Sequence, residues 1–320
     1  MGRPAEARRM ESLNRMAIEL VDEALDFADE LGVVVHELDD EATVLDFGVD
    51  VESGVEAGML LVEIQTAGLA TVQTSAGEVA GAPRTHVELS TDRPGLALLG
   101  AQKAGWELSV DGYEGLASGP ARALVAEEDE YARLGYRDDF ELTALAVESD
   151  ALPTAAVADH VAERTGVESS AVFLPAFATG SVAGSVAAAA RAAELAVFRL
   201  SELGYDPADV VSAAGSAPLA PVSHDEATAL ARTNDAVAYG GRVHLQVASD
   251  FDRVDEVVSS AAAEYGEPFV DVFEAVEWDY GALPADVFGP AQVTVDVLDG
   301  PTHVVGERHE ELLAESFHER

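Results

Sequence analysis

The sequence has no cysteine and only one lysine among its 320 residues. The absence of cysteine excludes disulfide bonds, thiolate metal sites and a cysteine nucleophile. Long apolar runs are also absent: the uncharged residues 169–190 are rich in Gly, Ser and Ala and are interrupted by Pro175 and Gly180, which argues against a membrane-spanning helix. Residues 1–10 lack the apolar run of a signal peptide. These absences predict a soluble, cytoplasmic protein with no membrane partner.

Basic residues are scarce: 18 Lys and Arg stand against 60 Asp and Glu, a formal net charge of −42. Binding of nucleic-acid phosphates needs a basic stripe, so we expect no nucleic-acid partner. In dilute salt the acidic groups repel one another and destabilise the compact state, whereas concentrated salt screens them. This balance is typical of proteins from halophiles that accumulate salt. We therefore expect the protein to need high potassium salt for stability.

The apolar pattern predicts a packed α/β protein, and the length favours about two domains. A composition break at Ser149-Asp-Ala-Leu-Pro153 suggests a boundary between residues 1–149 and residues 150–320, and the two domains could exchange segments. Helices are predicted at residues 12–31, 94–104, 120–134, 153–164, 180–203, 224–232 and 252–265. Strands are predicted at residues 33–38, 43–49, 60–64, 70–74, 86–90, 142–148, 171–174, 236–239, 243–248, 292–298 and 302–306.

Charge is nearly absent between Ser169 and Phe198, where only Arg191 and Glu194 are charged in a chain that is 24% charged. A helix in this segment must therefore be buried almost all round. Arg191 and Glu194 are three residues apart, so they share one face of the helix. One interpretation is a buried ion pair that holds two domains together. The other is a functional cleft, in which burial and the guanidinium would tune a carboxylate base.

The single lysine, Lys103, lies in an unusually uncharged stretch, residues 94–106. A chain that has discarded nearly every other lysine and keeps this one points to a function for it. The alternative is a remnant on a solvated turn, and composition alone does not decide between the two.

Four segments rich in Gly, Ser and Pro stand at the ends of predicted elements, at residues 90–94, 117–122, 214–221 and 233–242. Ser118-Gly-Pro before a helix leaves backbone N–H groups free to bind an anion. Arg122 and Arg242 suit a carboxylate or a phosphate. Taken singly, each segment can equally be an ordinary turn.

Signatures of metal, nucleotide and serine-hydrolase sites are missing from the sequence. Its eight histidines include no H-x-H or H-E-x-x-H spacing, and no segment fits a P-loop, a G-x-G-x-x-G or a G-x-S-x-G pattern. We expect no metal and no bound cofactor.

Taken in order, the motifs have a specific resemblance. They are Ser90-Thr-Asp-x-Pro94, Ala101-Gln-Lys-Ala-Gly-Trp106, Ala117-Ser-Gly-Pro-Ala-Arg-Ala-Leu124, Leu134-Gly-Tyr136, Gly184-Ser185 with Arg191-x-x-Glu194, Ala214-Gly-x-Ala-Pro-x-Ala-Pro221 and Thr233-Asn-Asp-Ala-Val-x-Tyr-Gly-Gly-Arg242. From about residue 12 to the C-terminus, their order and spacing resemble the methenyltetrahydromethanopterin cyclohydrolases, archaeal enzymes of one-carbon metabolism. The alanine-rich residues 180–190 and the loop at residues 77–86 depart from the family pattern, which leaves the carrier open between tetrahydromethanopterin and a folate type.

The resemblance implies two α/β domains with an active cleft between them, commonly in a homotrimer. It also implies hydrolysis of the 5,10-methenyl bridge of a tetrahydropterin cation to the 5-formyl compound, without a redox cofactor. Glu194 would be the general base, Arg191 would orient it, and Lys103 would hold the pterin or the developing oxyanion. Substrate-binding positions implied by the matching motifs are Ser90, Thr91, Asp92, Ser118, Gly119, Arg122, Asn234, Asp235, Tyr239, Gly240, Gly241 and Arg242.

Three other readings of the sequence stay open. The first is a non-catalytic protein that binds the pterin carrier, and the second is an amidohydrolase that acts on another cyclic amidine. The third is an acidic structural protein, which would leave the shared low-charge setting of Arg191, Glu194 and Lys103 unexplained.

Overall fold

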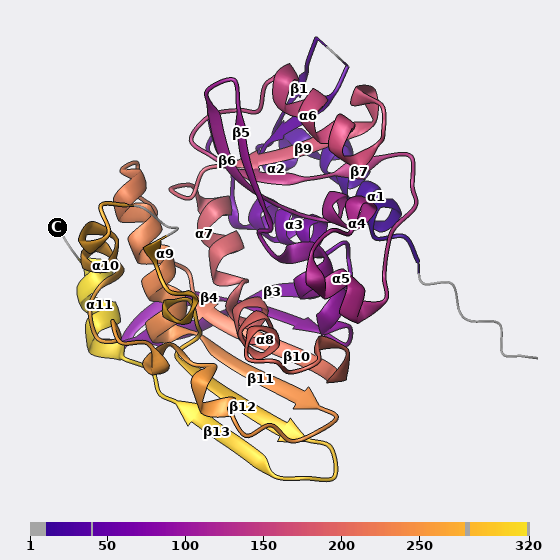
Figure 1. The fold of residues 1–320 in the computed structure, drawn as a ribbon. Coiled ribbons are helices and arrows are strands. Elements are labelled where there is room, and N and C mark those ends of the chain that lie inside the picture. The colour runs from indigo at the N-terminus through magenta and orange to yellow at the C-terminus, as the bar shows by residue number, and fades with distance from the viewer. Residues whose placement is uncertain (1–10, 40, 279–281, 319–320) are drawn as a thin grey trace, which may run out of the picture.

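A computed structural model describes residues 11–39, 41–278 and 282–318 (Figure 1). In this part of the chain two mixed β-sheets and the helices around them form an α/β fold, which confirms the predicted class. No helix of the described residues is long and apolar enough to cross a membrane. Residues 1–10, for which the sequence predicts no signal peptide, lie outside the described residues.

Sheet A has seven strands in the described residues. Their order is β1 (Val34–Glu37), β2 (Thr43–Asp46), β9 (Val172–Phe177), β8 (Ala146–Glu148), β6 (Tyr113–Ser118) and β5 (Trp106–Val110), and β7 (Thr143–Ala144) also pairs with β9. The central strand β9 runs parallel to β2, β7 and β8 and is almost wholly buried, as expected for a parallel strand covered on both faces.

Sheet B has six strands in the described residues. Their order is β13 (Thr302–Gly306), β12 (Gln292–Val297), β11 (Arg242–Val247), β10 (Val210–Pro218), β4 (Ala82–Thr91) and β3 (Thr71–Val79). Burial alternates along β11, where Val243, Leu245 and Val247 are buried and Arg242 and His244 are exposed. One face of sheet B therefore packs on the core and the other meets solvent.

Each sheet takes strands from both halves of the chain. The central strand of sheet A, β9, comes from beyond residue 150, whereas β3 and β4 of sheet B come from before it. The composition break at residues 149–153 therefore does not separate the two sheets. The division into residues 1–149 and 150–320 stays a prediction, together with the exchange of segments that it allowed.

Helices fill the space between the sheets (Figure 1). They are α1 (Leu13–Asp26), α3 (Val55–Gln65), α7 (Val182–Ala189), α8 (Ala192–Glu202) and the π-helix η1 (Gly95–Gln102). At the side of sheet B lie α9 (Glu226–Gly240), α10 (Phe269–Ala275) and α11 (Glu310–His318), and α6 (Ala155–Thr165) packs on sheet A. The shorter helices are α2 (Ala28–Leu31), α4 (Ala121–Val125) and α5 (Asp129–Leu134).

Three predicted elements are wrong. Residues 60–64 belong to helix α3 and residues 236–239 to helix α9, although both were predicted as strands. Both segments are short apolar runs buried on nearly all sides, and such runs have no periodicity that separates helix from strand. Residues 252–265 form only short 3₁₀ turns instead of an α-helix.

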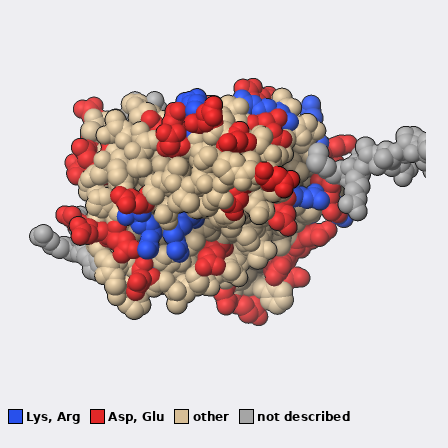
Figure 2. Space-filling model, turned by 90° about the horizontal axis from the view of Figure 1, so that it is seen from below, with Lys and Arg blue, Asp and Glu red and all other residues tan. Residues whose placement is uncertain are grey.

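The surface of the protein is unevenly charged. Viewed from below, where Figure 1 places sheet B, the molecule has a broad uncharged area with acidic side chains mainly towards its edges (Figure 2). Basic side chains are few and gather in small groups (Figure 2). Given the net charge of −42, such groups are candidates for function.

Candidate active site

Arg191 and Glu194 lie at the junction of α7 and α8. Helix α7 ends at Ala189 and α8 begins at Ala192, so the single helix predicted over residues 180–203 is interrupted where the pair lies. The Nε of Arg191 donates to Oε2 of Glu194 at 2.9 Å. Glu194 also stands in the first turn of α8, where the helix dipole favours a negative charge.

Only one member of this pair reaches solvent. The side chain of Glu194 is 1% exposed, whereas that of Arg191 is 30% exposed. Burial alone would lower the pKa of Arg191, but the nearby charges of Glu194 and Glu148 raise it above its usual value. The guanidinium therefore stays charged, and it is the part of the pair that a ligand can reach. Because the two residues are neighbours on one segment, their contact does not bridge the two sheets.

Gln102, the last residue of η1, packs against the same junction. Its Nε2 donates to the backbone oxygen of Ala190 over a long 3.4 Å. Its Oε1 is buried and has no hydrogen-bond partner among the described residues. An unsatisfied buried acceptor is costly and often marks a functional position. Gln102 is uncharged and was not among the predicted site residues, although it stands beside Lys103 in the motif of residues 101–106.

Lys103 lies against Phe198 of α8, the helix that carries Glu194. Its Nζ is 4.9 Å from the centre of the Phe198 ring and donates to Oε1 of Glu130. Phe198 follows Glu194 by four residues on α8, so both side chains belong to one helix face. The lysine side chain is only 19% exposed, which excludes a remnant on a solvated turn.

The partner of Lys103 is a carboxylate that is largely buried. Burial alone would raise the pKa of Glu130, but the hydrogen bond from Lys103 and the charges of Lys103 and Arg122 lower it below its usual value. The same carboxylate lies 3.9 Å from Nη2 of Arg122. Lys103 is therefore held in a charged network, and a ligand would have to share it with Glu130.

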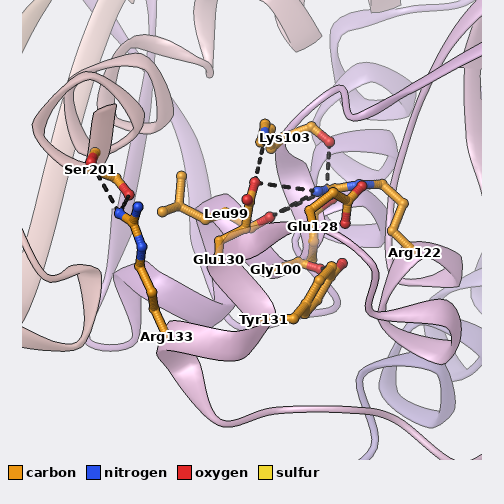
Figure 3. A network of polar contacts seen from close by, with 10 residues as sticks. Leu99, Gly100, Lys103, Arg122, Glu128, Glu130, Tyr131, Arg133 and Ser201 are labelled. Carbon is orange, nitrogen blue, oxygen red and sulfur yellow. Dashed lines mark hydrogen bonds and ion pairs between the residues drawn. The ribbon is translucent and has the colours of Figure 1, made fainter. Parts of the chain in front are cut away.

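Arg122 lies inside the protein, in the network of Figure 3. Its side chain is fully buried, and Nη1 donates to the backbone oxygen of Lys103 at 2.7 Å while Nε donates to Glu128 at 3.0 Å. Further donors reach the backbone oxygens of Leu99 and Ala101. This set of partners gives Arg122 a structural role, because it fixes the end of η1 and thereby the position of Lys103.

Ser118 and Gly119 also lie inside, at the end of β6. Ser118 accepts a hydrogen bond from Nε2 of Gln65 at 2.9 Å, and the backbone N–H of Gly119 donates to Ala101 at 2.8 Å. Gly119 has φ +120°, a conformation that favours glycine. Ser118 and Gly119 thus lie next to η1. Of the predicted site residues, the structure brings these two together with Lys103 and Arg122.

In the motif at residues 233–242, residues 233–240 belong to helix α9 instead of a loop, and Gly241 is the C-cap of the helix. Asn234 donates to the backbone oxygen of Leu230 at 2.9 Å, and Gly240 and Gly241 leave room for neighbouring backbone and side chains. Asp235 accepts from the N–H of Phe269 at 2.9 Å and from Ser316 at 2.6 Å, which ties α9 to α10 and α11.

Tyr239, also on α9, is buried as well. Its hydroxyl donates to the backbone oxygen of Glu267 at 2.5 Å and accepts from the N–H of Gly266 at 3.2 Å. Burial raises the pKa of Tyr239 to about 12. The tyrosine is therefore neutral, and its hydroxyl is already used to fix the chain before α10.

Ser90 and Arg242 come together elsewhere, on the solvent face of sheet B. Both line an open concavity of about 490 Å³. Thr91, one residue after Ser90, turns inward and donates to the backbone oxygen of Leu69 at 2.7 Å, whereas Asp92 is exposed. The predicted binding residues are therefore divided between the interior near η1, helix α9 and this outer face.

Metal-ligating side chains do not cluster in the described ranges 11–39, 41–278 and 282–318, where no group of three or more His, Asp or Glu could hold a metal ion. The contacts His244–Asp296 at 2.8 Å and His303–Asp250 at 2.7 Å each join two residues near the solvent.

Comparisons with known proteins agree with the motifs. The family described as Cyclohydrolase (MCH) matches residues 12–317. A protein of Halobacterium salinarum named methenyltetrahydromethanopterin cyclohydrolase is 61% identical over 96% of this chain and 99% of its own length. Proteins of the same name from Methanocella arvoryzae and Methanosphaerula palustris are 39% and 37% identical over 96% of this chain and 98% and 99% of theirs. The chain therefore belongs to the methenyltetrahydromethanopterin cyclohydrolase family.

Proposed function

We propose that this protein hydrolyses the 5,10-methenyl bridge of a tetrahydropterin carrier to the 5-formyl compound. The family supports the reaction, and the observation that carries the assignment to residues is the buried Glu194 carboxylate bonded to the half-open Arg191. The methenyl carbon bridges two nitrogens as an amidinium and is already electrophilic. The protein therefore has to activate water and manage protons, for which a positioned carboxylate is sufficient.

The reaction balances with Glu194 as the only proton carrier of the protein. Glu194 takes a proton from water as the water oxygen bonds to the methenyl carbon, which gives a neutral tetrahedral adduct. The bond from this carbon to N10 then breaks, and N10 receives the proton that Glu194 held. The adduct hydroxyl releases its proton to solvent and becomes the formyl oxygen on N5. One water is consumed and one proton is released.

Arg191 and Lys103 would assist without carrying the proton. Arg191 orients the Glu194 carboxylate through its Nε, and because it keeps the solvent side of the pair, we place the substrate on that side. Lys103, on the same face of α8, would hold the pterin or stabilise the adduct oxygen if Glu130 releases it.

The remaining parts of the proposal follow the family. The relatives are named for tetrahydromethanopterin, which we propose as the carrier, and a folate-type carrier is the alternative. We further propose that the protein works in the cytoplasm as a homo-oligomer, most simply a trimer, with no redox cofactor. We also propose no nucleic-acid partner, because a net charge of −42 repels phosphates.

The test is loss of the methenyl absorbance band when enzyme is added in molar KCl. The wild-type protein should remove the band, and Glu194→Gln should slow its loss by about 100-fold or more. Glu202→Gln, an exposed carboxylate on the same helix, is the matched control and should be unaffected. Full activity of Glu194→Gln would exclude Glu194 as the base, and binding without turnover by the wild type would indicate a carrier-binding protein.

A substrate panel separates the remaining alternatives. It contains the methenyl forms of tetrahydromethanopterin and tetrahydrofolate and a cyclic amidine without the pterin. Turnover of either pterin carrier, at a rate well above that of the simple amidine, supports the proposal. Preference for the amidine would indicate an amidohydrolase of a different specificity.

A further inference from the structure

The outer face of sheet B carries a second polar centre, away from Glu194. Gly215 on β10 faces α8, since a Cβ placed there would lie 2.7 Å from the backbone nitrogen of Ala193. Side chains alternate along a strand, so the next residue, Ser216, points to the opposite face. Ser216 pairs in register with Arg242 of β11, which therefore shares this outer face. The sheet thus separates Ser216 and Arg242 from helix α8.

Arginines gather at this end of the sheet, although the chain has only 18 basic residues. Burial is the main cause that lowers the pKa of His86. The charges of Arg242 and Arg308 are close enough to lower it further. Arg84 lies two residues before His86 on β4 and so shares its face. A chain with a net charge of −42 would gain stability by spreading these arginines among its acids, so their grouping needs another explanation.

Several polar atoms of this group lack partners. Four buried atoms have no hydrogen-bond partner by geometry within the described residues. They are the two ring nitrogens of His86, Oγ of Ser216 and Nε of Arg84. The His86 side chain is 3% exposed, and the backbone of Glu78 and the charge of Glu88 raise its pKa less than burial and the arginines lower it. A buried polar group without a hydrogen-bond partner destabilises the folded protein. Of these residues, Ser216 lines an open concavity, where a ligand can supply the missing hydrogen bond.

Glu88, the nearest acid on the same face, does not neutralise the group by direct contact. Its Oε1 accepts from Ser75 at 2.6 Å and its Oε2 accepts from Gln73 at 2.8 Å, so both oxygens are held by β3. These two hydrogen bonds, with Arg242 and His86, lower the pKa of Glu88. Among the ion pairs of the described residues none involves Arg242, whereas Arg308 contacts Glu310 at 2.7 Å.

The space beside Arg242 is large enough for a small molecule. The concavity of about 490 Å³ is lined by Arg242 and Ser216 together with Gln292, Thr294 and His244. This volume falls in the range of small-ligand sites. The lining combines the guanidinium of Arg242, which forms no ion pair within the described residues, with hydroxyl and amide groups that bind an oxyanion. Its one carboxylate, Glu88, is held by Gln73 and Ser75 of β3.

We propose that Arg242 and Ser216 bind the phosphate or carboxylate group of a small metabolite on the outer face of sheet B. The site lies across the sheet from Arg191 and Glu194, so its occupant does not compete with the reacting methenyl group. The site does not rest on the cyclohydrolase activity. Arg242 was predicted to bind the pterin substrate, and the proposed site gives it a different ligand.

The experiment measures thermal unfolding in molar KCl against added inorganic phosphate or glutarate. Both probes are oxyanions, and the one with the lower half-saturating concentration identifies the source as phosphate or carboxylate. Arg242→Gln should raise that concentration by about 10-fold or more, as expected for loss of a charge-assisted contact. Arg15→Gln, which removes the same charge from an exposed position on α1, is the matched control and should respond as the wild type.

Two results would overturn the proposal. One is the absence of any saturable shift with either anion in the wild-type protein. The other is an equal shift in the wild type and in Arg242→Gln, which would mean that the anions act on the surface generally. Glu194→Gln should retain the anion response whatever its activity, so the outcome is independent of the proposed reaction.

Discussion

Arg191 donates to Glu194 at 2.9 Å from the solvent side of the α7–α8 junction, and it is the only ion-pair partner of that carboxylate among the described residues. Because the carboxylate is 1% exposed, solvent does little to compensate it and the contact with Arg191 does most of this. Removal of one partner of a buried pair leaves an uncompensated charge, whereas removal of both does not. We therefore expect a single substitution in the pair to lower the stability of the protein more than the double substitution does.

We expect Arg191→Met to destabilise the protein by about 3–5 kcal/mol, because it leaves Glu194 buried and unpaired. The double variant Arg191→Met with Glu194→Leu should recover part of that loss. Thermal unfolding in molar KCl measures both, with Arg15→Met as the control for loss of an exposed arginine. Equal stability of Arg191→Met and Arg15→Met would show that the contact does not stabilise the fold.

Glu130 predicts a pH dependence of stability. Its pKa is lowered in the folded protein from the ordinary 4.5, so its stabilising contribution is complete above that value and is lost as the pH falls through the folded pKa. The stability difference between wild type and Glu130→Gln should therefore be largest near neutrality and shrink in acid. Unfolding followed at a series of pH values checks this, with the exposed Glu202→Gln as control. A difference that does not change with pH would contradict the role of Lys103 as its partner.

Local patterns predicted much of the fold. The helix at residues 12–31 was visible from its apolar face and corresponds to α1 and α2. The strands β5, β6 and β10 were not predicted, and β10 lies in a small-residue stretch that looked like a turn. The pairing of β4 with β10 joins residues more than a hundred positions apart, and no local periodicity reports such a contact.

The candidate site was predictable where charge was scarce. Arg191, Glu194 and Lys103 stood out because neighbouring residues are uncharged, and the structure places them on or against α8. Gln102 stayed unnoticed because an uncharged amide gives no such contrast, and its unsatisfied oxygen appears only with the packing. The Gly-Gly of residues 240–241 suggested a binding loop, but it allows α9 to pack closely on its neighbours.

Gly105 controls the geometry around Arg122. A Cβ at this position would lie 2.5 Å from Nε of Arg122, whose side chain is fixed by backbone oxygens. Since the arginine has no room to shift, Gly105→Ala should destabilise the protein by about 1–3 kcal/mol, as for other overpacked sites. Gly100→Ala is the control, because the added methyl group would meet its nearest neighbours at an ordinary van der Waals distance of 3.6 Å or more. Similar melting temperatures of the two variants would show that Arg122 can move.

The net charge of −42 predicts that salt sets the stability of the whole protein. At an ionic strength of about 0.01 M the Debye length is about 30 Å, so acidic groups across the molecule repel one another, whereas at about 1 M it is about 3 Å and the repulsion is confined to neighbours. We expect the melting temperature to rise strongly with KCl and the protein to unfold on dialysis into dilute buffer. Sucrose at matched osmolality separates charge screening from general exclusion of solute, since it should restore much less stability than KCl. A melting temperature that is unchanged between dilute and molar KCl would mean that the acidic surface does not oppose folding.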